Sequence, residues 1–204
     1  MTVTALVLAA GSASRFGSVK LLAPLDGRPV LQHTLDAVAS AGLDDVVVVL
    51  GQAAADVEAA IAWRGERRVV NPSPTDGLAS SLRIGIAAAS ADPACQAVLV
   101  LLGDQPSVRP AVLRSVAFVG EVRPEPFVRA RYAHDGAPNP VLVKRAAFAE
   151  ASAMTGDRGL GPLLAAEPTR VHAVDVEGGN PDVDTPADLA ALAAEHARAA
   201  EATR

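Results

Sequence analysis

Three short runs of the chain consist almost entirely of apolar residues, many of them β-branched, at residues 4–10, 46–50 and 97–102. A strand that is apolar at nearly every position is covered on both faces, as in a parallel sheet flanked by helices. A membrane-spanning helix needs about 20 consecutive apolar residues, and none of the runs approaches that length. The runs therefore predict buried strands of a single sheet.

Stretches with the periodicity of amphipathic helices separate these runs. The first begins at Pro29, a favoured first position of helices, and ends at Gly42. Alternating strands and helices are typical of a parallel sheet with helices on both faces. We therefore predict an α/β fold with three α/β/α layers around a mostly parallel, Rossmann-like sheet. Further helices are expected over residues 52–63, 77–90 and 108–119, and a short strand over 67–70.

The second part of the chain has a different texture. Prolines and glutamates alternate over residues 121–126 and mark a break. Residues 127–132 and 140–143 are expected to pair as strands, and one interpretation makes them a small insertion over the sheet. A last strand is expected over 170–176 and a closing helix from 186 to about 200. A length of 204 residues fits one domain.

Charge and cysteine content exclude several classes of protein. The net charge of −5 disfavours nucleic acid as a partner, because phosphate backbones attract basic surfaces. Cys95 is the only cysteine, so neither an internal disulfide nor a cysteine zinc cluster is possible. The N-terminus lacks the basic segment of a secretory signal peptide. These features favour a cytoplasmic protein that has no membrane partner.

The loop after the first strand has the features of a phosphate-binding site. From Gly11 it reads Gly-Ser-Ala-Ser-Arg-Phe-Gly-Ser-Val-Lys. Small residues after a strand expose backbone N–H groups that bind anions, and Arg15 and Lys20 add two cations. The dinucleotide-binding pattern is excluded because Ala13 and Phe16 occupy two of its glycine positions, and the P-loop pattern because two residues separate the second glycine from the lysine. The alternative is an ordinary turn with solvated basic residues.

At this loop the sequence resembles a known family. The pattern Leu-Ala-Ala-Gly…Arg-Phe-Gly-x-x-Lys is similar to the signature of nucleotidyltransferases that activate sugars, isoprenoid precursors and molybdopterin. Among these it most resembles the molybdenum cofactor cytidylyltransferases and their guanylyltransferase relatives. The resemblance implies the nucleotide-diphospho-sugar transferase fold in one domain over 1–204, with a nucleotide-binding half over about 1–120 and an acceptor-binding half over about 121–204.

The resemblance also assigns roles within the loop. It implies that the loop cradles a nucleoside triphosphate, and that Arg15 and Lys20 contact its phosphate oxygens as catalytic groups. The residues that it assigns to the nucleotide here are Leu8, Ala9, Ala10, Gly11, Ser12, Arg15 and Lys20.

Two acidic segments are candidates for a metal site. Asp104 follows the strand at 97–102, at the sheet edge where open parallel sheets bind ligands. Mg²⁺ takes one or two carboxylates plus phosphate oxygens, although a turn or helix-capping aspartate is the alternative. Asp182 and Asp184 share one side of an extended segment, and Thr185 before a proline suits a helix start. The motifs Gly-Asp-Gln-Pro and Asp-x-Asp-Thr-Pro resemble the family's, which implies that Asp104 and Asp184 hold Mg²⁺, with Asp182 a weaker candidate.

The segment before the helix at 77–90 predicts contacts with a nucleobase. Small polar residues at a helix N-terminus can reach a base edge or ribose without steric conflict. Helix capping by Asp76 or Ser73 is the alternative. The pattern Asn-Pro…Gly-x-x-Ser-Ser-Leu resembles the family's nucleobase segment and assigns Asn71, Gly77, Ser80 and Ser81 to the base, with Asp104 as a further ribose and metal contact.

The substrates follow less directly from the resemblance. Ala10 stands where guanylyltransferases of the family have a second glycine, and its methyl group favours CTP over GTP, an effect of ~1–3 kcal/mol. On the acceptor side, Asn139 replaces a histidine, and Gly161-Pro162 stands where Ala-Arg is expected. Arg158 is a possible replacement for the missing cation.

The implied reaction is attack of an acceptor phosphate on CTP. The family's acceptor is molybdopterin, and the product is the cytosine dinucleotide cofactor of a molybdenum hydroxylase. Two alternatives stay open at this point. One is a same-fold enzyme that uses GTP or another phosphorylated acceptor, and the other is a non-catalytic nucleotide-binding chaperone.

Overall fold

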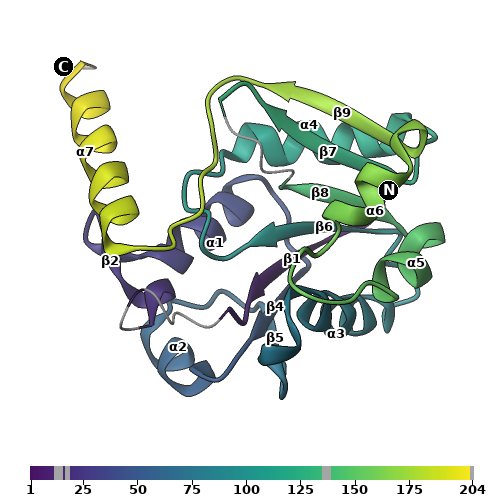
Figure 1. Cartoon of the computed structure of the whole chain (residues 1–204), viewed down its shortest axis with the longest axis horizontal. Helices are drawn as coiled ribbons and strands as arrows, with labels where there is room; N and C mark the ends of the chain where they lie inside the picture. The colour runs from purple at the N-terminus through teal and green to yellow at the C-terminus, as the bar shows by residue number, and fades with distance from the viewer. Residues whose placement is uncertain (12–15, 17–18, 135–138, 203–204) are drawn as a thin grey trace.

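A seven-stranded sheet with helices on both faces forms the centre of the molecule (Figure 1). The computed structural model describes residues 1–11, 16, 19–134 and 139–202. A short hairpin of β2 (Pro24–Leu25) and β3 (Arg28–Pro29) lies outside this sheet. In order across the sheet, the strands are β5 (Arg67–Val70), β4 (Val46–Leu50), β1 (Val3–Ala9), β6 (Ala97–Leu102), β8 (Val141–Lys144), β7 (Phe127–Tyr132) and β9 (Val171–Val176).

All strands of the sheet except one point the same way. β5, β4, β1 and β6 are parallel to one another, and β9 is parallel to β7. β8 is antiparallel to both of its neighbours, β6 and β7. The predicted three-layer, mostly parallel α/β fold is confirmed.

The interpretation of β7 and β8 as an insertion over the sheet is wrong. β8 lies inside the main sheet, between β6 and β7. Val141, Leu142 and Val143 have no exposed surface. An apolar run of this kind needs cover on both faces, which a central position in the sheet provides and a surface insertion does not.

The helices differ from the predicted ones mainly in length. Helix α2 is shorter than predicted because the backbone turns extended at Ile61, whose side chain is buried. Helices α5 and α6 were not predicted, since such short segments show no clear periodicity. No helix in the described part of the chain combines the length and hydropathy needed to cross a membrane. The helices are α1 (Val30–Ser40), α2 (Ala54–Ala60), α3 (Leu78–Ser90), α4 (Pro110–Val122), α5 (Phe148–Ser152), α6 (Gly161–Ala166) and α7 (Pro186–Ala202), with 3₁₀ turns η1 (Lys20–Leu22), η2 (Pro74–Asp76), η3 (Arg145–Ala147) and η4 (Pro168–Arg170).

Alternate residues of β1 face opposite helical layers. Val7 and Ala9 pack into one core with residues of α1 and α4. Leu6 and Leu8 pack into the other core with α3, α5 and α6. Burial on both faces accounts for the unbroken apolar run of this strand.

Helix α7 closes the chain on the left of Figure 1, next to the hairpin. Thr185 Oγ1 accepts a hydrogen bond from the backbone N–H of Asp188 (3.2 Å), and Asp188 Oδ2 accepts one from the N–H of Thr185 (2.7 Å). This reciprocal pair is a capping box, so the predicted helix start is confirmed. Leu192 of α7 and Val183 before it pack against Leu25 of β2. The C-terminal segment is thereby fixed beside the region that follows β1.

Gly51 fixes the backbone at the end of β1 by direct contact. A Cβ atom at position 51 would lie 2.5 Å from the carbonyl oxygen of Ala10 and 2.9 Å from its Cα. Such distances leave no room for a side chain. The backbone of Ala10 therefore depends on glycine at this crossing.

We expect Gly51→Ala to lower the free energy of unfolding by about 1–3 kcal/mol, because the added methyl group forces the backbone of Ala10 to move. Urea unfolding followed by circular dichroism measures the change. Gly161→Ala is the matched control, since no atom lies within 4 Å of a Cβ at that position. Equal stability of Gly51→Ala and the wild type would contradict the close contact.

Candidate active site

The carboxyl ends of β1 and β6 meet at the point where the strand order reverses. After β1 the chain builds β4 and β5 on one side, and it then returns to place β6 on the other side. The N–H of Gly103 donates to the carbonyl of Leu8 (2.9 Å), and the N–H of Val183 donates to the carbonyl of Asp104 (2.9 Å). Open α/β sheets bind ligands at such a point. The structure thus brings three sequence-predicted segments to one place.

Lys20 lies between the two predicted metal-binding aspartates. Its Nζ is 2.5 Å from Asp104 Oδ2 and 2.8 Å from Asp184 Oδ1. The residue is only 8% exposed. Burial by itself lowers the pKa of the ammonium group, but the charges and hydrogen bonds of Asp104 and Asp184 outweigh it and raise the pKa above its usual value. Lys20 is therefore charged, and it shares one location with both carboxylates.

Asp182 adds a third carboxylate to this cluster. Loss of solvent around its carboxyl group, together with the negative charge of Asp104, raises the pKa of Asp182 to about 6. Asp182 lines the same cavity as Asp104. When all three aspartates are ionised, the cluster that they form with Lys20 carries an excess of negative charge.

Two buried amides that sequence reasoning missed hold the acidic segments together. Gln105 and Asn180 are each 1% exposed, and Asn180 Nδ2 donates to Gln105 Oε1 (3.2 Å). Thr34 Oγ1 of α1 donates to the carbonyl of Gln105 (3.4 Å). Gln105 follows Asp104 directly in the sequence, yet its pairing with Asn180 is a long-range contact that no local pattern reveals.

A cavity of about 240 Å³ opens beside the acidic cluster. Six of the twelve residues predicted to contact the nucleotide line this cavity. Lys20 is not among the lining residues, and the side chain of Ala9 packs in the core on the opposite face of the sheet. Ser12 and Arg15 lie outside the described residues. The cavity is lined by Leu8, Ala10, Gly11, Pro74, Gly77, Leu78, Ser81, Leu102, Asp104, Asp157 and Asp182.

Asn71 and Ser80 shape the cavity from behind and are not among its lining residues. Asn71 Nδ2 donates to Ser80 Oγ (2.7 Å) and Ser81 Oγ (2.9 Å), and its Oδ1 accepts from the N–H of Ser73 (2.9 Å). Ser80 Oγ donates to the carbonyl of Gly77 (2.8 Å). No side chain caps the N-terminus of α3, so the capping alternative for this segment is wrong.

The loop that precedes α6 lies against the segment predicted to contact the base, although the sequence pattern placed it with the acceptor. The N–H of Ala79 donates to the carbonyl of Gly156 (3.1 Å). A Cβ at Gly77 would lie 2.5 Å from the Gly156 carbonyl carbon and 2.6 Å from Asp157 Oδ1. Gly77 also has a positive φ of 91°, which favours glycine. Two independent constraints therefore keep this position free of a side chain.

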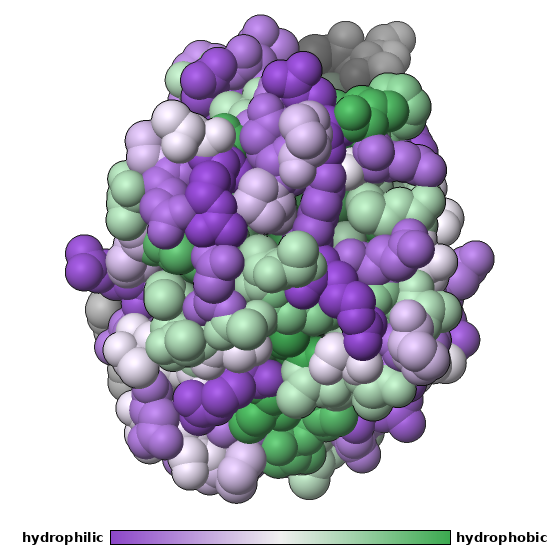
Figure 2. All heavy atoms as spheres, turned by 90° about the vertical axis from the view of Figure 1, so that its right-hand side faces the viewer, coloured by the Kyte–Doolittle hydropathy of each residue, from purple (hydrophilic) through white to green (hydrophobic). Residues whose placement is uncertain are grey.

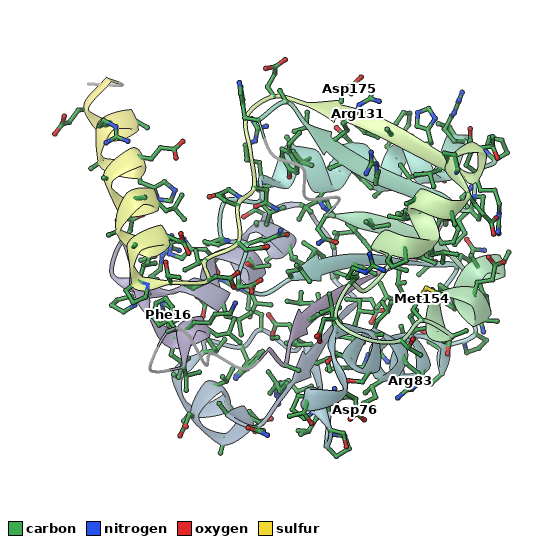
Figure 3. All side chains as sticks on the ribbon, viewed as in Figure 1. Phe16, Asp76, Arg83, Arg131, Met154 and Asp175 are labelled. Carbon is green, nitrogen blue, oxygen red and sulfur yellow. The ribbon has the colours of Figure 1, made fainter. Side chains whose placement is uncertain are left out.

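A second cavity, of about 500 Å³, lies where α6 crosses β7 and β9. Its walls include Arg129, Arg131 and Gly161. The N–H of Gly161 donates to the carbonyl of Arg158 (3.0 Å), in the loop that also contains Asp157. Arg131 makes a two-point ion pair with Asp175 (Figure 3). Among the described residues Arg129 has no ion-pair partner, so its charge is available to an anion.

On the side of the molecule that Figure 2 shows, hydrophobic and hydrophilic residues are intermingled.

The donor atoms at the acidic cluster fit a hard divalent cation. Asp104 and Asp184 both reach one point, where Lys20 now lies. Carboxylate oxygens are preferred ligands of Mg²⁺ and Mn²⁺, and two of them leave room for phosphate oxygens. No three His, Cys, Asp or Glu side chains converge into a preformed metal site within the described ranges.

We expect Lys20→Met to bind Mn²⁺ about ten-fold or more tightly than the wild type when no nucleotide is present. Removing the ammonium leaves Asp104 and Asp184 without a compensating charge and strengthens their attraction for a divalent cation. Titration followed by electron paramagnetic resonance of free Mn²⁺ gives both affinities. Arg131→Met, which breaks a distant surface ion pair, is the control. Unchanged Mn²⁺ affinity in Lys20→Met would show that the ammonium does not compete with the cation.

Several known proteins are similar to this chain. Rv0371c of Mycobacterium tuberculosis is 37% identical with a TM-score of 0.86, covering 95% of this chain and 97% of that one. Rv0371c has also been solved as a manganese complex, at 34% identity over 95% of this chain and 99% of that one, with a TM-score of 0.82. A nucleotidyl transferase from Methanothermobacter is 29% identical with a TM-score of 0.77, covering 97% of this chain and 99% of that one.

Two curated relatives differ in how much of them the chain covers. Nicotine blue oxidoreductase of Paenarthrobacter nicotinovorans is 32% identical over 90% of this chain and 92% of that protein. The bifunctional protein GlmU of Sinorhizobium fredii is 36% identical over 114 residues, which are 55% of this chain but only 25% of GlmU. The MobA-like NTP transferase domain matches residues 5–173. The chain therefore belongs to the MobA-like NTP transferase family and is a nucleotidyltransferase.

Proposed function

We propose that this nucleotidyltransferase moves CMP from CTP, bound with Mg²⁺, to a phosphorylated acceptor and releases pyrophosphate. The observation that carries the proposal is the contact of Lys20 with Asp104 and Asp184 beside a cavity at the switch point of the sheet. A cation and two carboxylates at this place suit a metal–triphosphate complex.

The charges of the cluster determine how the triphosphate binds. Three carboxylates around one ammonium repel a polyanion, so the nucleotide enters with a divalent cation. Asp104 and Asp184 would hold Mg²⁺, which would neutralise phosphate charge. The ammonium of Lys20 then moves from the carboxylates to the phosphate oxygens, where it stabilises the negative charge that develops on the leaving pyrophosphate.

The transfer step requires no general base. A phosphate oxygen of the acceptor is anionic at neutral pH and attacks the α-phosphorus of CTP. A bond forms between that oxygen and the α-phosphorus, the bond from the α-phosphorus to the bridging oxygen breaks, and pyrophosphate leaves with the bonding electron pair. Catalysis by this chain is then alignment of the two substrates and neutralisation of charge.

The preference for CTP rests on the size of the base slot. Ala10 lines the cavity, and Gly51 packs against the backbone of Ala10. This contact prevents the methyl group from withdrawing to admit a purine. A pyrimidine fits the narrower slot.

The acceptor that we propose is molybdopterin, and the product would be the cytosine dinucleotide cofactor of a molybdenum hydroxylase in the cytoplasm. The family to which the chain belongs supports this choice. The second cavity offers Arg129 to the acceptor's phosphate, a role that Arg158 was expected to fill. Arg158 lines neither of the two cavities.

The direct test measures pyrophosphate release from CTP, GTP, ATP and UTP, with molybdopterin and Mg²⁺ present. We expect release from CTP that depends on molybdopterin. Pyrophosphate release from GTP alone would show that GTP, and not CTP, is the substrate. Release that does not require molybdopterin would show that molybdopterin is not the acceptor. CTP binding without release would indicate a chaperone, and reduction of a dye substrate in place of transfer would indicate a redox enzyme.

We expect Asp104→Asn to reduce turnover about 100-fold or more while the protein stays folded. The amide keeps the shape of the side chain, and Lys20 retains Asp184 as a partner, but the charge that holds Mg²⁺ is lost. Pyrophosphate release gives the turnover, and circular dichroism checks the fold. Asp76→Asn, at an exposed aspartate of η2 that lines neither cavity (Figure 3), is the control and retains activity. Wild-type turnover in Asp104→Asn would remove Asp104 from the mechanism.

A further inference from the structure

The loop containing Asp157 is fixed against the N-terminus of α3. The Gly156 carbonyl accepts a hydrogen bond from the N–H of Ala79 (3.1 Å). Gly156 and Asp157 also approach Gly77 so closely that a side chain at position 77 would collide with them. A Cβ at Gly159 would likewise lie 2.8 Å from Leu78 Cδ2. Contacts at both ends of the loop therefore set the position of Asp157.

The carboxylate of Asp157 faces the cavity without a partner among the described residues. It lines the cavity together with Ala10, Gly77 and Ser81. It makes no capping hydrogen bond to α3, although it lies at the start of that helix. A carboxylate in this place accepts hydrogen bonds and donates none.

Ser81 offers the complementary group. Its Oγ accepts a hydrogen bond from Asn71 Nδ2, a buried amide whose oxygen is held in turn by the N–H of Ser73. Because Asn71 supplies the hydrogen of that bond, the hydroxyl hydrogen of Ser81 is left to donate, and Ser81 lines the cavity. One wall of the cavity thus presents an acceptor at Asp157 and a donor at Ser81.

We propose that Asp157 distinguishes cytosine from uracil. Its carboxylate accepts a hydrogen bond from the 4-amino group of cytosine, while Ser81 donates to an acceptor of the same ring. Uracil carries a carbonyl oxygen in place of the amino group, so two acceptors would face each other and repel. The inference rests on the proposed function, in which the cavity holds the base of CTP.

This role divides base selection between two residues. Ala10 limits the size of the base and excludes purines, whereas Asp157 selects among the pyrimidines by hydrogen bonding. A polar group that loses its partner discriminates more strongly than a missing methyl group, because the unpaired group is left without compensation. Asp157 belongs to the chain's second half and joins the base pocket through the contacts of its loop with Gly77, Leu78 and Ala79.

The test compares the dissociation constants of CTP and UTP, measured by calorimetry with Mg²⁺ and without an acceptor. The proteins are the wild type, Asp157→Asn, Asp157→Ala and the control Asp76→Asn. Asp76 is an exposed aspartate of η2 that also lies next to α3 but does not line the cavity (Figure 3). Thermal melting checks that each variant is folded.

We expect the wild type and Asp76→Asn to bind CTP about ten-fold or more tightly than UTP. In Asp157→Ala the ratio approaches one, because only CTP loses affinity. Asp157→Asn also gains affinity for UTP, since its amide can donate to the uracil carbonyl.

Three results would overturn the role of Asp157. The first is a wild type that binds CTP and UTP equally, and the second is a CTP preference that persists in both Asp157 variants. The third is an equal loss of CTP and UTP affinity, which would assign Asp157 to packing of the loop. A wild type that binds neither nucleotide would contradict the proposed function itself, whereas normal CTP turnover with an unchanged ratio would reject only this inference.

Discussion

One buried ammonium group organises the candidate site. Lys20 contacts Asp104 at the end of β6 and Asp184 before α7, 164 residues further along the chain. Removing a charge from water costs roughly several kcal/mol unless opposite charges compensate, so neither Lys20 nor its partners can be placed independently. The ion pairs therefore fix η1, the end of β6 and the C-terminal segment relative to one another. The capping box and the small core beneath α7 keep that segment from withdrawing. Phe16 belongs to the same core and lies at the foot of α7 in Figure 3.

The side of the cavity that we propose for the base is organised by packing and neutral hydrogen bonds. Asn71 uses its amide to orient Ser80 and Ser81, and Gly77 lets the Asp157 loop approach the start of α3. Gly51 likewise allows the backbone of Ala10 to pack closely against it, because it has no side chain. In the function that we propose, Lys20 changes partners on the phosphate side, whereas hydrogen bonds and glycine contacts hold the base side in place. This division suits a transferase that must release pyrophosphate yet keep the nucleotide aligned.

Several features could be predicted from the sequence because they depend on residues close together in the chain. The apolar runs gave the buried strands, and the residues that follow them gave the positions of Gly11 and Asp104 at the ligand-binding edge. The Thr185–Asp188 capping box is likewise a local pattern. The resemblance to nucleotidyltransferases, which the family match confirms, came from short motifs that fold as single loops.

The sequence by itself thus determined the strands of the main sheet and the longer helices, and which polar residues lie at strand ends. Only the tertiary structure decided which of these segments meet. It placed β8 between β6 and β7, brought the Asp157 loop against the start of α3, and paired Lys20 with two distant aspartates. Local periodicity in the sequence predicts only whether a residue is buried. The identity of the covering partner depends on chain crossings and on close backbone approaches, such as Gly77 against Gly156, which are set by the packing of the whole fold.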